Sequence, residues 1–247
     1  AHLEKLNIQS LSLSDTNEVL GCNTLEELQA LEKAYHISTA KKFLNRGVSF
    51  ADLEKVKFRG NISIEKGAFI DENVIFEGTV LIGTNAKIGP GCIISNSEIG
   101  KNAELLAYSF VEESMLESNA KAGPFARVGV QTRMEEGAEI GNFVETKRSN
   151  IGANSKAKHL AYIGDGRIGK GVNIGAGTIF CNYDGVKKHI TKIEDDAFIG
   201  SNSALVAPLT IGAKSYIGSG SVVTKNVGKG QLAIGRGRQK NMPNRKK

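Results

Sequence analysis

Aliphatic residues recur along this chain at intervals of six. The dipeptide Ile-Gly occurs eleven times between residues 82 and 217. The longest unbroken register, five steps of six residues, runs through Ile193, Ile199, Leu205, Ile211, Ile217 and Val223. A helix predicts apolar residues three and four positions apart, and a straight strand predicts alternation. The period of six therefore predicts a chain that turns a corner every six residues.

A hexad built from one short strand and one corner places its aliphatic residue inward, and a following glycine lets the backbone bend. Three hexads close a triangular coil, and coils stacked about 4.8 Å apart form a continuous core. Residues 62 to 227 leave room for about nine coils. The thirteen-residue interval between Phe180 and Ile193 breaks the period. We expect this segment to loop out of a mainly β solenoid, where binding residues concentrate.

The amino-terminal fifth has a helical pattern instead. Thr24 and Glu27 have the spacing of a capping box, which predicts a helix from Leu25. Tyr35 continues the helical spacing of the leucines, and Gly47 is a plausible end. One or two short helices are therefore expected before the solenoid.

Composition narrows the class of protein to which this chain belongs. The chain has 247 residues, 40% of them apolar, with 29 glycines and no tryptophan, which is typical of a core built from Ile, Val, Leu and Ala. The opening residues show no secretory pattern and no run is long enough to span a membrane, so we expect a soluble cytoplasmic protein. Three widely spaced cysteines argue against a disulfide framework and a zinc finger.

The net charge of +6 raises the question of a nucleic-acid partner, because residues 236–247 hold six arginines and lysines. The chain lacks the interleaved aromatic and basic residues of single-strand binders. Phosphorylated small molecules explain the charge more simply, and a solvated tail is the plainest alternative. We therefore expect no nucleic-acid partner.

His159 is the best candidate for a general base, since imidazole takes up protons near neutral pH. Four positions that the repeat does not require, separated by 12, 14 and 9 residues, are Lys147, His159, Asn173 and Asn182. On coils of about 18 residues they fall on adjacent turns and are able to converge. A satisfied surface histidine is the alternative.

Charged and amide side chains near these positions suit a phosphorylated substrate. Arg127 offers a planar fork to phosphate, whereas Lys147 and Lys188 offer point charges. Asn173 and Asn182 are able to orient substrate amides or hydroxyls, although asparagine also suits tight corners. Taken singly, each residue has an ordinary structural explanation.

An ordered set of motifs makes the pattern specific. It comprises Glu18-Val19-Leu20-Gly21-Cys22-Asn23, Gly141-Asn142-Phe143-Val144-Glu145, His159-Leu160, Asn173-Ile174-Gly175-Ala176-Gly177-Thr178, Cys181-Asn182-Tyr183-Asp184-Gly185 and Ala233-Ile234-Gly235-Arg236. The chain resembles, over nearly its whole length, the carboxy-terminal part of the bifunctional bacterial N-acetylglucosamine-1-phosphate uridyltransferase/glucosamine-1-phosphate acetyltransferase.

The resemblance implies a left-handed parallel β-helix, a hexapeptide-repeat solenoid, assembled as a homotrimer with sites between subunits. It implies acetyl transfer from acetyl-CoA to the amino group of glucosamine-1-phosphate, in the pathway to UDP-N-acetylglucosamine and the precursors of peptidoglycan and lipopolysaccharide. His159 is then the base. Sugar-phosphate contacts are implied for Arg127, Lys147, Tyr162 and Asn173. Acetyl-CoA contacts are implied for Asn182, Tyr183, Ser201, Ser219 and Arg236, with Lys188 as a loop lysine that reaches toward the neighbouring site.

The resemblance has one departure and one missing half. Where the family reads Arg-Leu-Arg-Pro-Gly, this chain has Gly129 in place of the second arginine, which is a phosphate ligand in the family. Two alternatives stay open: Arg133 compensates, or the affinity for the sugar phosphate is reduced. The uridyltransferase half is absent. Asn23 matches a Mg²⁺ and nucleotide contact at its end, so Mg²⁺ is expected to serve only that missing half.

The predicted domains are residues 1–22, the end of a truncated nucleotidyltransferase domain; 23–60, a helical linker; 61–235, the β-helix acetyltransferase domain; and 236–247, a basic tail. Two other interpretations of the function stay open. A zinc-dependent hydratase on the same prism needs three converging histidines, and only His159 and His189 lie in the solenoid body. A non-catalytic regulatory or assembly solenoid is the other.

Overall fold

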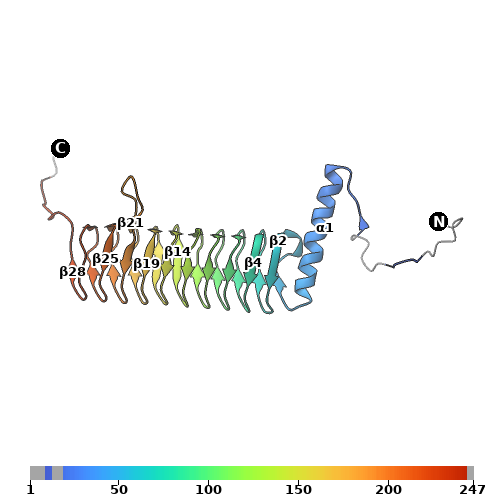
Figure 1. Ribbon diagram of the computed structural model, residues 1–247, viewed down its shortest axis with the longest axis horizontal. Helices are drawn as coiled ribbons and strands as arrows, with labels where there is room; N and C mark the ends of the chain where they lie inside the picture. The colour runs from blue at the N-terminus through green and yellow to red at the C-terminus, as the bar shows by residue number, and fades with distance from the viewer. Residues whose placement is uncertain (1–8, 13–18, 244–247) are drawn as a thin grey trace.

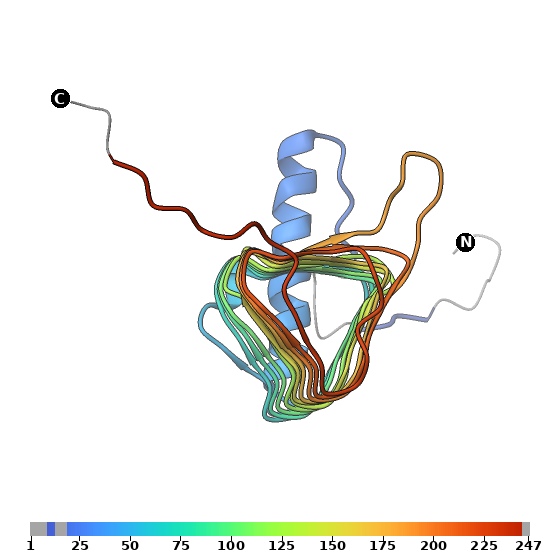
Figure 2. The same cartoon turned by 90° about the vertical axis from the view of Figure 1, so that its left-hand side faces the viewer.

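The computed structural model describes residues 9–12 and 19–243, most of which form one long prism with a triangular cross-section (Figures 1 and 2). Helix α1 (Leu25–Leu44) and the short 3₁₀ helix η2 (Leu53–Lys55) precede the main body of the coil. The predicted fold, a mainly β left-handed parallel β-helix preceded by short helices, is confirmed. Most of the predicted domain remnant at 1–22, and the last four residues of the predicted tail, lie outside the described residues.

Each face of the prism is a stack of short parallel strands. The first face consists of β1 (Ser49–Phe50), β3 (Phe69–Ile70), β5 (Lys87–Ile88), β8 (Glu104–Leu105), β11 (Lys121–Ala122), β14 (Glu139–Asn142), β17 (Lys156–His159), β20 (Asn173–Ile174), β23 (Phe198–Ile199), β26 (Tyr216–Ile217) and β28 (Leu232–Ala233). Its eleven strands correspond to about ten turns of the coil. The expected nine is one too few because β1 and β28 extend the stack beyond residues 62 and 227.

Two long strands, β2 (Lys57–Ile64) and β4 (Ile75–Ile82), run across both remaining faces. The second face continues with β6 (Ile93–Ser95), β9 (Phe110–Glu112), β12 (Arg127–Val128), β15 (Glu145–Lys147), β18 (Tyr162–Gly164), β21 (Ile179–Cys181), β24 (Ala204–Val206) and β27 (Val222–Val223). The third face continues with β7 (Glu98–Ile99), β10 (Met115–Leu116), β13 (Arg133–Met134), β16 (Asn150–Ile151), β19 (Gly166–Ile168), β22 (Thr191–Ile193) and β25 (Leu209–Ile211).

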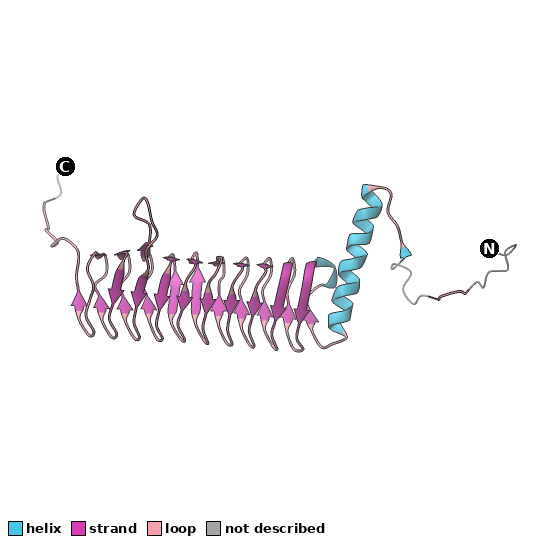
Figure 3. Cartoon of the chain, viewed as in Figure 1, coloured by secondary structure: helices cyan, strands magenta, loops and turns pink. Residues whose placement is uncertain are grey.

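Register between coils follows the repeat. Paired residues lie 17 residues apart between β14 and β17, and 18 apart between β2 and β4. The separation rises to 25 between β20 and β23. The extra residues form the predicted loop between β21 and β22, which projects from the prism (Figure 3).

The inward residue of each short strand forms the core. Isoleucines such as Ile88, Ile140, Ile199 and Ile217 are at most 1% exposed. Because each sits directly over the corresponding residue of the previous coil, the apolar core is continuous along the prism. Burying one such side chain contributes about 1.5–3 kcal/mol.

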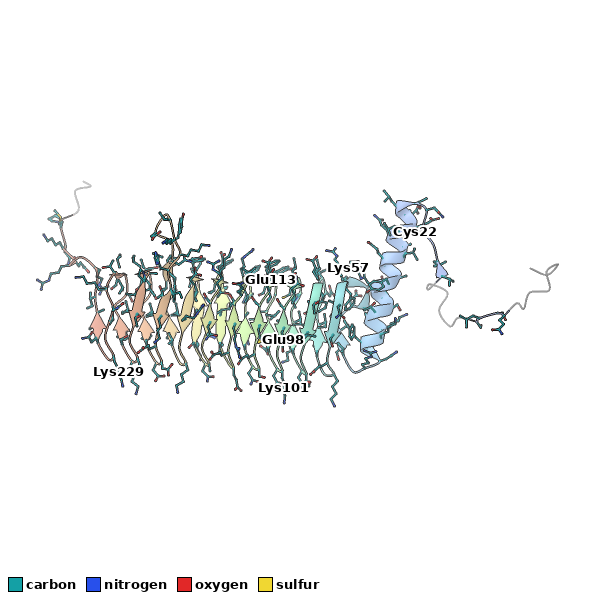
Figure 4. The ribbon with its side chains drawn as sticks, viewed as in Figure 1. Cys22, Lys57, Glu98, Lys101, Glu113 and Lys229 are labelled. Atoms are coloured by element: carbon teal, nitrogen blue, oxygen red, sulfur yellow. The ribbon has the colours of Figure 1, made fainter. Side chains whose placement is uncertain are left out.

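Many outward positions are polar, and side chains such as Lys101 and Lys229 project from the prism (Figure 4). Other outward positions carry exposed apolar side chains, such as Leu81 and Tyr216. On the first face, opposite charges alternate from coil to coil through Lys87, Glu104, Lys121, Glu139 and Lys156. Directly opposed unlike charges favour this register. In the part of the chain that the structure describes, no helix is both long and apolar enough to cross a membrane.

Helix α1 begins as predicted. The Thr24 hydroxyl accepts from the backbone of Glu27 at 3.1 Å, and the Glu27 carboxylate accepts from the backbone of Thr24 at 3.2 Å. The packing face differs from the expected one, because Leu25 and Tyr35 are 80% and 53% exposed. The helix instead packs through a buried set nearer its carboxyl end, which consists of His36, Ala40 and Phe43.

His36 joins this helix to the prism. Its Nδ1 atom accepts a hydrogen bond from the backbone of Phe58 at 3.1 Å, and burial lowers the pKa of the imidazole. Phe43 stacks on Phe58 with ring centroids 5.8 Å apart. The helix is thereby fixed across the open end of the core, where the first coils would otherwise expose apolar residues.

Candidate functional site

His159 lies at the end of β17, on the edge where the first face meets the second. Equivalent positions on successive coils place one column of residues along this edge: Asn142, His159, Ala176, Ser201 and Ser219. Backbone bonds from Leu160 to Asn142, from Asn202 to Ala176 and from Gly220 to Ser201 hold the coils in this register. We call this column the His159 edge. Its histidine and serines are exposed to solvent.

The imidazole of His159 has one engaged nitrogen. Its Nδ1 atom lies 2.7 Å from the Oδ1 atom of Asn142, the residue directly beneath it. A carboxamide oxygen only accepts, so Nδ1 carries the proton in this pair. In the neutral imidazole with this tautomer, Nε2 is the unprotonated acceptor, which is the form that a general base requires.

The second face carries three of the four predicted sugar-phosphate residues, Arg127, Lys147 and Tyr162. Arg127, Glu145 and Tyr162 are directly paired across β12, β15 and β18, and Lys147 lies at the end of β15. The Arg127 guanidinium lies 3.6 Å from a Glu112 oxygen and 4.0 Å from a Glu145 oxygen. Lys147 makes no ion pair with any described residue. Lys147 therefore has the freer positive charge for an incoming phosphate.

Gly129 stands between Glu112 and Lys147 in the outward column of this face. A Cβ atom at this position would lie 2.6 Å from the backbone oxygen of Thr146, so a longer side chain requires the next coil to shift. Arg133 does not compensate from its observed position. It lies on the third face, and its Nε donates to Glu117 at 2.6 Å.

The projecting loop between β21 and β22 carries Asn182, Tyr183 and Lys188. Tyr183 and Lys188 form an antiparallel bridge, so the loop is a small hairpin. At its tip the Asp184 carboxylate accepts from the backbones of Val186 and Lys187 at 2.8 and 2.6 Å. These backbone bonds and the imidazole of His189 hold the pKa of Asp184 far below its usual range.

Asn182 is 6% exposed and lies at the neck of this loop. Its side chain and that of Tyr162 both lie close to Gly164. A Cβ atom on Gly164 would meet the Tyr162 hydroxyl at 2.5 Å and the Asn182 Nδ2 atom at 2.7 Å. The structure thus brings one predicted sugar contact and one predicted acetyl-CoA contact to the same spot.

Three predicted residues remain, and they lie in different places. Arg236 donates to the backbone oxygen of Ser219 at 2.8 Å and so reaches the carboxy-terminal end of the His159 edge. Asn173 lies on the first face, three residues before the edge position Ala176. Asn23 is separate from both, just before helix α1, and its backbone donates to Glu27.

Among residues 9–12 and 19–243, no three histidine, cysteine or carboxylate side chains are placed to hold a metal ion. The Glu27 carboxylate beside Asn23 is engaged in capping the helix. The described residues therefore provide no Mg²⁺ site around Asn23, and its predicted role stays a prediction. His189 likewise bonds to Asp184, at 2.7 Å, rather than converging with His159.

Sequence reasoning did not assign roles to Asn142, Arg148 and Asp165. Asn142 was part of a recognised motif, and its spacing of seventeen residues from His159 was the available signal. Arg148 and Asp165 carry no motif signal of their own. They become visible only when the coils stack and place them beneath Asn182.

Known proteins provide three kinds of comparison: a family model, solved structures and curated relatives. The model for the bacterial transferase hexapeptide (six repeats) matches residues 61–96 and 190–225. Among solved structures, a Francisella novicida UDP-N-acetylglucosamine acyltransferase is 18% identical, with a TM-score of 0.41, over 70% of this chain and 60% of that one. A match at this level carries no functional assignment.

Curated relatives are much more similar. The chain is 44% identical to the bifunctional protein GlmU of Marinobacter nauticus and 48% identical to that of Pseudoalteromonas atlantica. Each match covers 91% of this chain and 50% of the relative, so the chain spans about half the length of the curated relatives it matches. With its hexapeptide repeats and this identity over nine-tenths of its length, the chain belongs to the family of the bifunctional protein GlmU.

Proposed function

We propose that this chain transfers the acetyl group of acetyl-CoA to the amino group of glucosamine-1-phosphate, giving N-acetylglucosamine-1-phosphate. The observation that carries the proposal is the His159 edge. Its histidine is oriented by Asn142 at 2.7 Å, and Ser201 and Ser219 follow two and three coils further along. At about 4.8 Å per coil, these serines lie roughly 10 and 14 Å from His159.

This column fits an extended thioester. With the acetyl carbonyl at His159, the pantetheine arm runs past Ser201 and Ser219 toward Arg236, which supplies a positive charge at the far end for the coenzyme's phosphates. Asn182 and Tyr183 lie at the opposite corner of the second face, where the loop projects, and from there they contact the coenzyme held at the edge of a neighbouring subunit. Lys147 and Arg127 hold the sugar phosphate on the second face, and Tyr162 and Asn173 orient the sugar from either side of the edge.

The chemistry is direct transfer. The neutral substrate amine attacks the thioester carbonyl, forming a C–N bond, while Nε2 of His159 takes up the amine proton. Collapse of the tetrahedral intermediate breaks the C–S bond, and the imidazolium returns that proton to the departing coenzyme A sulfur. No acyl-enzyme forms. Placing both substrates on one rigid edge supplies the proximity that lowers the barrier.

The edge is open on one side, which supports a homotrimer with sites between subunits. Beside His159, a ladder of exposed apolar side chains occupies the same edge: Tyr108, Phe125, Phe143 and Leu160. All four adopt the left-handed backbone conformation, which is rare for such residues. A second copy packed on this ladder would cover it and provide the second wall of the groove, within reach of Lys188 on a neighbouring loop.

The parent protein is proposed to act in the cytoplasm, in the pathway to UDP-N-acetylglucosamine, and to add a Mg²⁺-dependent uridyltransferase activity from its other half. The test of the acetyltransferase is thiol release from acetyl-CoA with glucosamine-1-phosphate as the acceptor. We expect His159→Ala to lower kcat by about 10²–10⁴-fold. Lys158→Ala, on the neighbouring exposed residue, is the matched control and should retain activity. An inactive parent chain would favour the non-catalytic solenoid.

A further inference from the structure

Arg148, Asp165 and Asn182 form a column beneath the projecting loop. They are spaced by seventeen residues and occupy the corner between the second and third faces on successive coils. Arg148 Nε donates to one oxygen of Asp165 at 2.7 Å and Nη2 donates to the other at 2.7 Å. Asn182 Nδ2 donates to the second of these oxygens at 2.5 Å. One carboxylate thus joins three coils.

Asp165 is well shielded and stays charged. Its side chain is 13% exposed, and that of Arg148 is 24% exposed. The hydrogen bond from Arg148 lowers the pKa of the Asp165 carboxyl, and the hydrogen bond from Asn182 lowers it further. A two-pronged arginine–carboxylate pair is among the stronger polar contacts in proteins and fixes geometry as well as charge.

Both ends of the loop meet this column. At the entry, Asn182 is bound to Asp165 through its side chain and accepts at its backbone oxygen from the His189 amide at 2.7 Å. At the exit, the Thr191 amide donates to the backbone oxygen of Asp165 at 3.3 Å. Because the hairpin above is held by its own internal bonds, its direction relative to the prism depends on this neck.

We propose that Arg148 and Asp165 are positioning residues for acetyl-CoA, which orient the Asn182 carboxamide and the neck of the loop. A carboxylate only accepts hydrogen bonds, so Asp165 selects the amino end of the Asn182 carboxamide and leaves its oxygen for a donor of the bound coenzyme. Arg148 in turn holds Asp165 in the orientation that makes this selection. The role in acetyl-CoA binding rests on the proposed function. The support that Arg148 and Asp165 give to Asn182 and the loop neck does not depend on a bound substrate.

The test uses Asp165→Asn and Arg148→Met in the full chain. We expect the KM for acetyl-CoA to rise about tenfold in each, while the KM for glucosamine-1-phosphate stays within about twofold of the parent. Amide hydrogen exchange at His189, measured without ligand, should accelerate about tenfold as the neck loosens. Arg133→Met, which removes an arginine–carboxylate pair on the third face far from the loop, is the matched control and should change none of these values.

A charge swap separates positioning from simple stabilisation. In the double variant Arg148→Asp with Asp165→Arg, an ion pair is retained, but the residue beneath Asn182 becomes a donor and selects the opposite end of its carboxamide. The acetyl-CoA KM should stay raised although thermal stability returns. A swap that restores the acetyl-CoA KM would overturn the proposal, as would parental KM and exchange values in folded single variants. If the parent chain is inactive, the proposed function fails, and exchange at His189 alone decides the positioning.

Discussion

Replacing Gly164 with alanine is the sharpest probe of the site, because the three atoms nearest to the added methyl group all belong to side chains of predicted site residues. The Cβ atom would lie 2.5 Å from the Tyr162 hydroxyl and 2.7 Å from the Asn182 Nδ2 atom. Ordinary contact begins near 3.4 Å, so the two groups must retreat by about 0.9 and 0.7 Å. The backbone of Gly164 needs no left-handed conformation, so alanine itself is not strained there.

The expected result is a loss of activity with little loss of structure. Misplacing a positioning group by about 1 Å is able to lower the rate about 10²-fold, so kcat/KM should fall by about that factor. The Asn182–Asp165 bond would lengthen, lowering the free energy of unfolding by about 1–2 kcal/mol. Acetyl transfer kinetics and the thermal midpoint by circular dichroism measure the two effects on the same preparations.

Gly100→Ala is the matched control, since it adds the same methyl group at a different corner in an earlier coil. There the Cβ atom would meet backbone atoms of Leu116, Glu117 and Ser118 at 2.7–2.9 Å, which are not free to rotate away. This variant should lose about 3 kcal/mol of stability and keep the parental kcat/KM when folded. Parental kinetics in Gly164→Ala would refute the placement of Tyr162 and Asn182 in the site.

Three further predictions concern the loop, the thiols and the assembly. The pKa of Asp184 is lowered in the folded protein, so its carboxylate stabilises the loop at any pH above the ordinary pKa of 3.8. This contribution is lost as the pH falls below that value toward the lowered pKa. Asp184→Ala should therefore make the loop lysines sensitive to trypsin at neutral pH. Burial raises the pKa of the Cys92 thiol to about 11, so a thiol reagent at pH 8 should label the other two cysteines and reach this one only after denaturation. Phe125→Asn puts a polar residue into the apolar ladder, and asparagine suits the left-handed backbone conformation at this position. Sedimentation of this variant should show a folded monomer. An unchanged trimer would place the subunit interface elsewhere.

The repeat register explains which candidate residues stack on one edge of the prism, while their roles stay predictions. His159, Ser201 and Ser219 share one edge because their spacing matches whole coils, once the residues of the loop are discounted. The loop itself was predicted from the break in that register, and the structure places it between β21 and β22. Counting along a regular solenoid is reliable because every coil repeats the same geometry.

Side-chain partners were not predictable in this way. Arg133 was a plausible substitute for the missing arginine at Gly129, but stacking puts it on another face in a pair with Glu117. The leucines near the start of α1 had helical spacing, yet the helix packs through His36, Ala40 and Phe43. In both cases the choice depends on which neighbour lies within reach, and spacing along the chain does not contain that information.

By itself, the sequence determined the triangular solenoid, the capped helix before it, the exit of the loop and the family. The first three follow from local periodicity and from turn and cap chemistry, which act between residues close together in the chain. The family follows instead from the resemblance carried by the ordered set of motifs. Only the tertiary structure decided that Asn142 orients His159 and that Arg148 and Asp165 support Asn182. Those contacts join successive coils, and their geometry exists only once the coils are stacked in register.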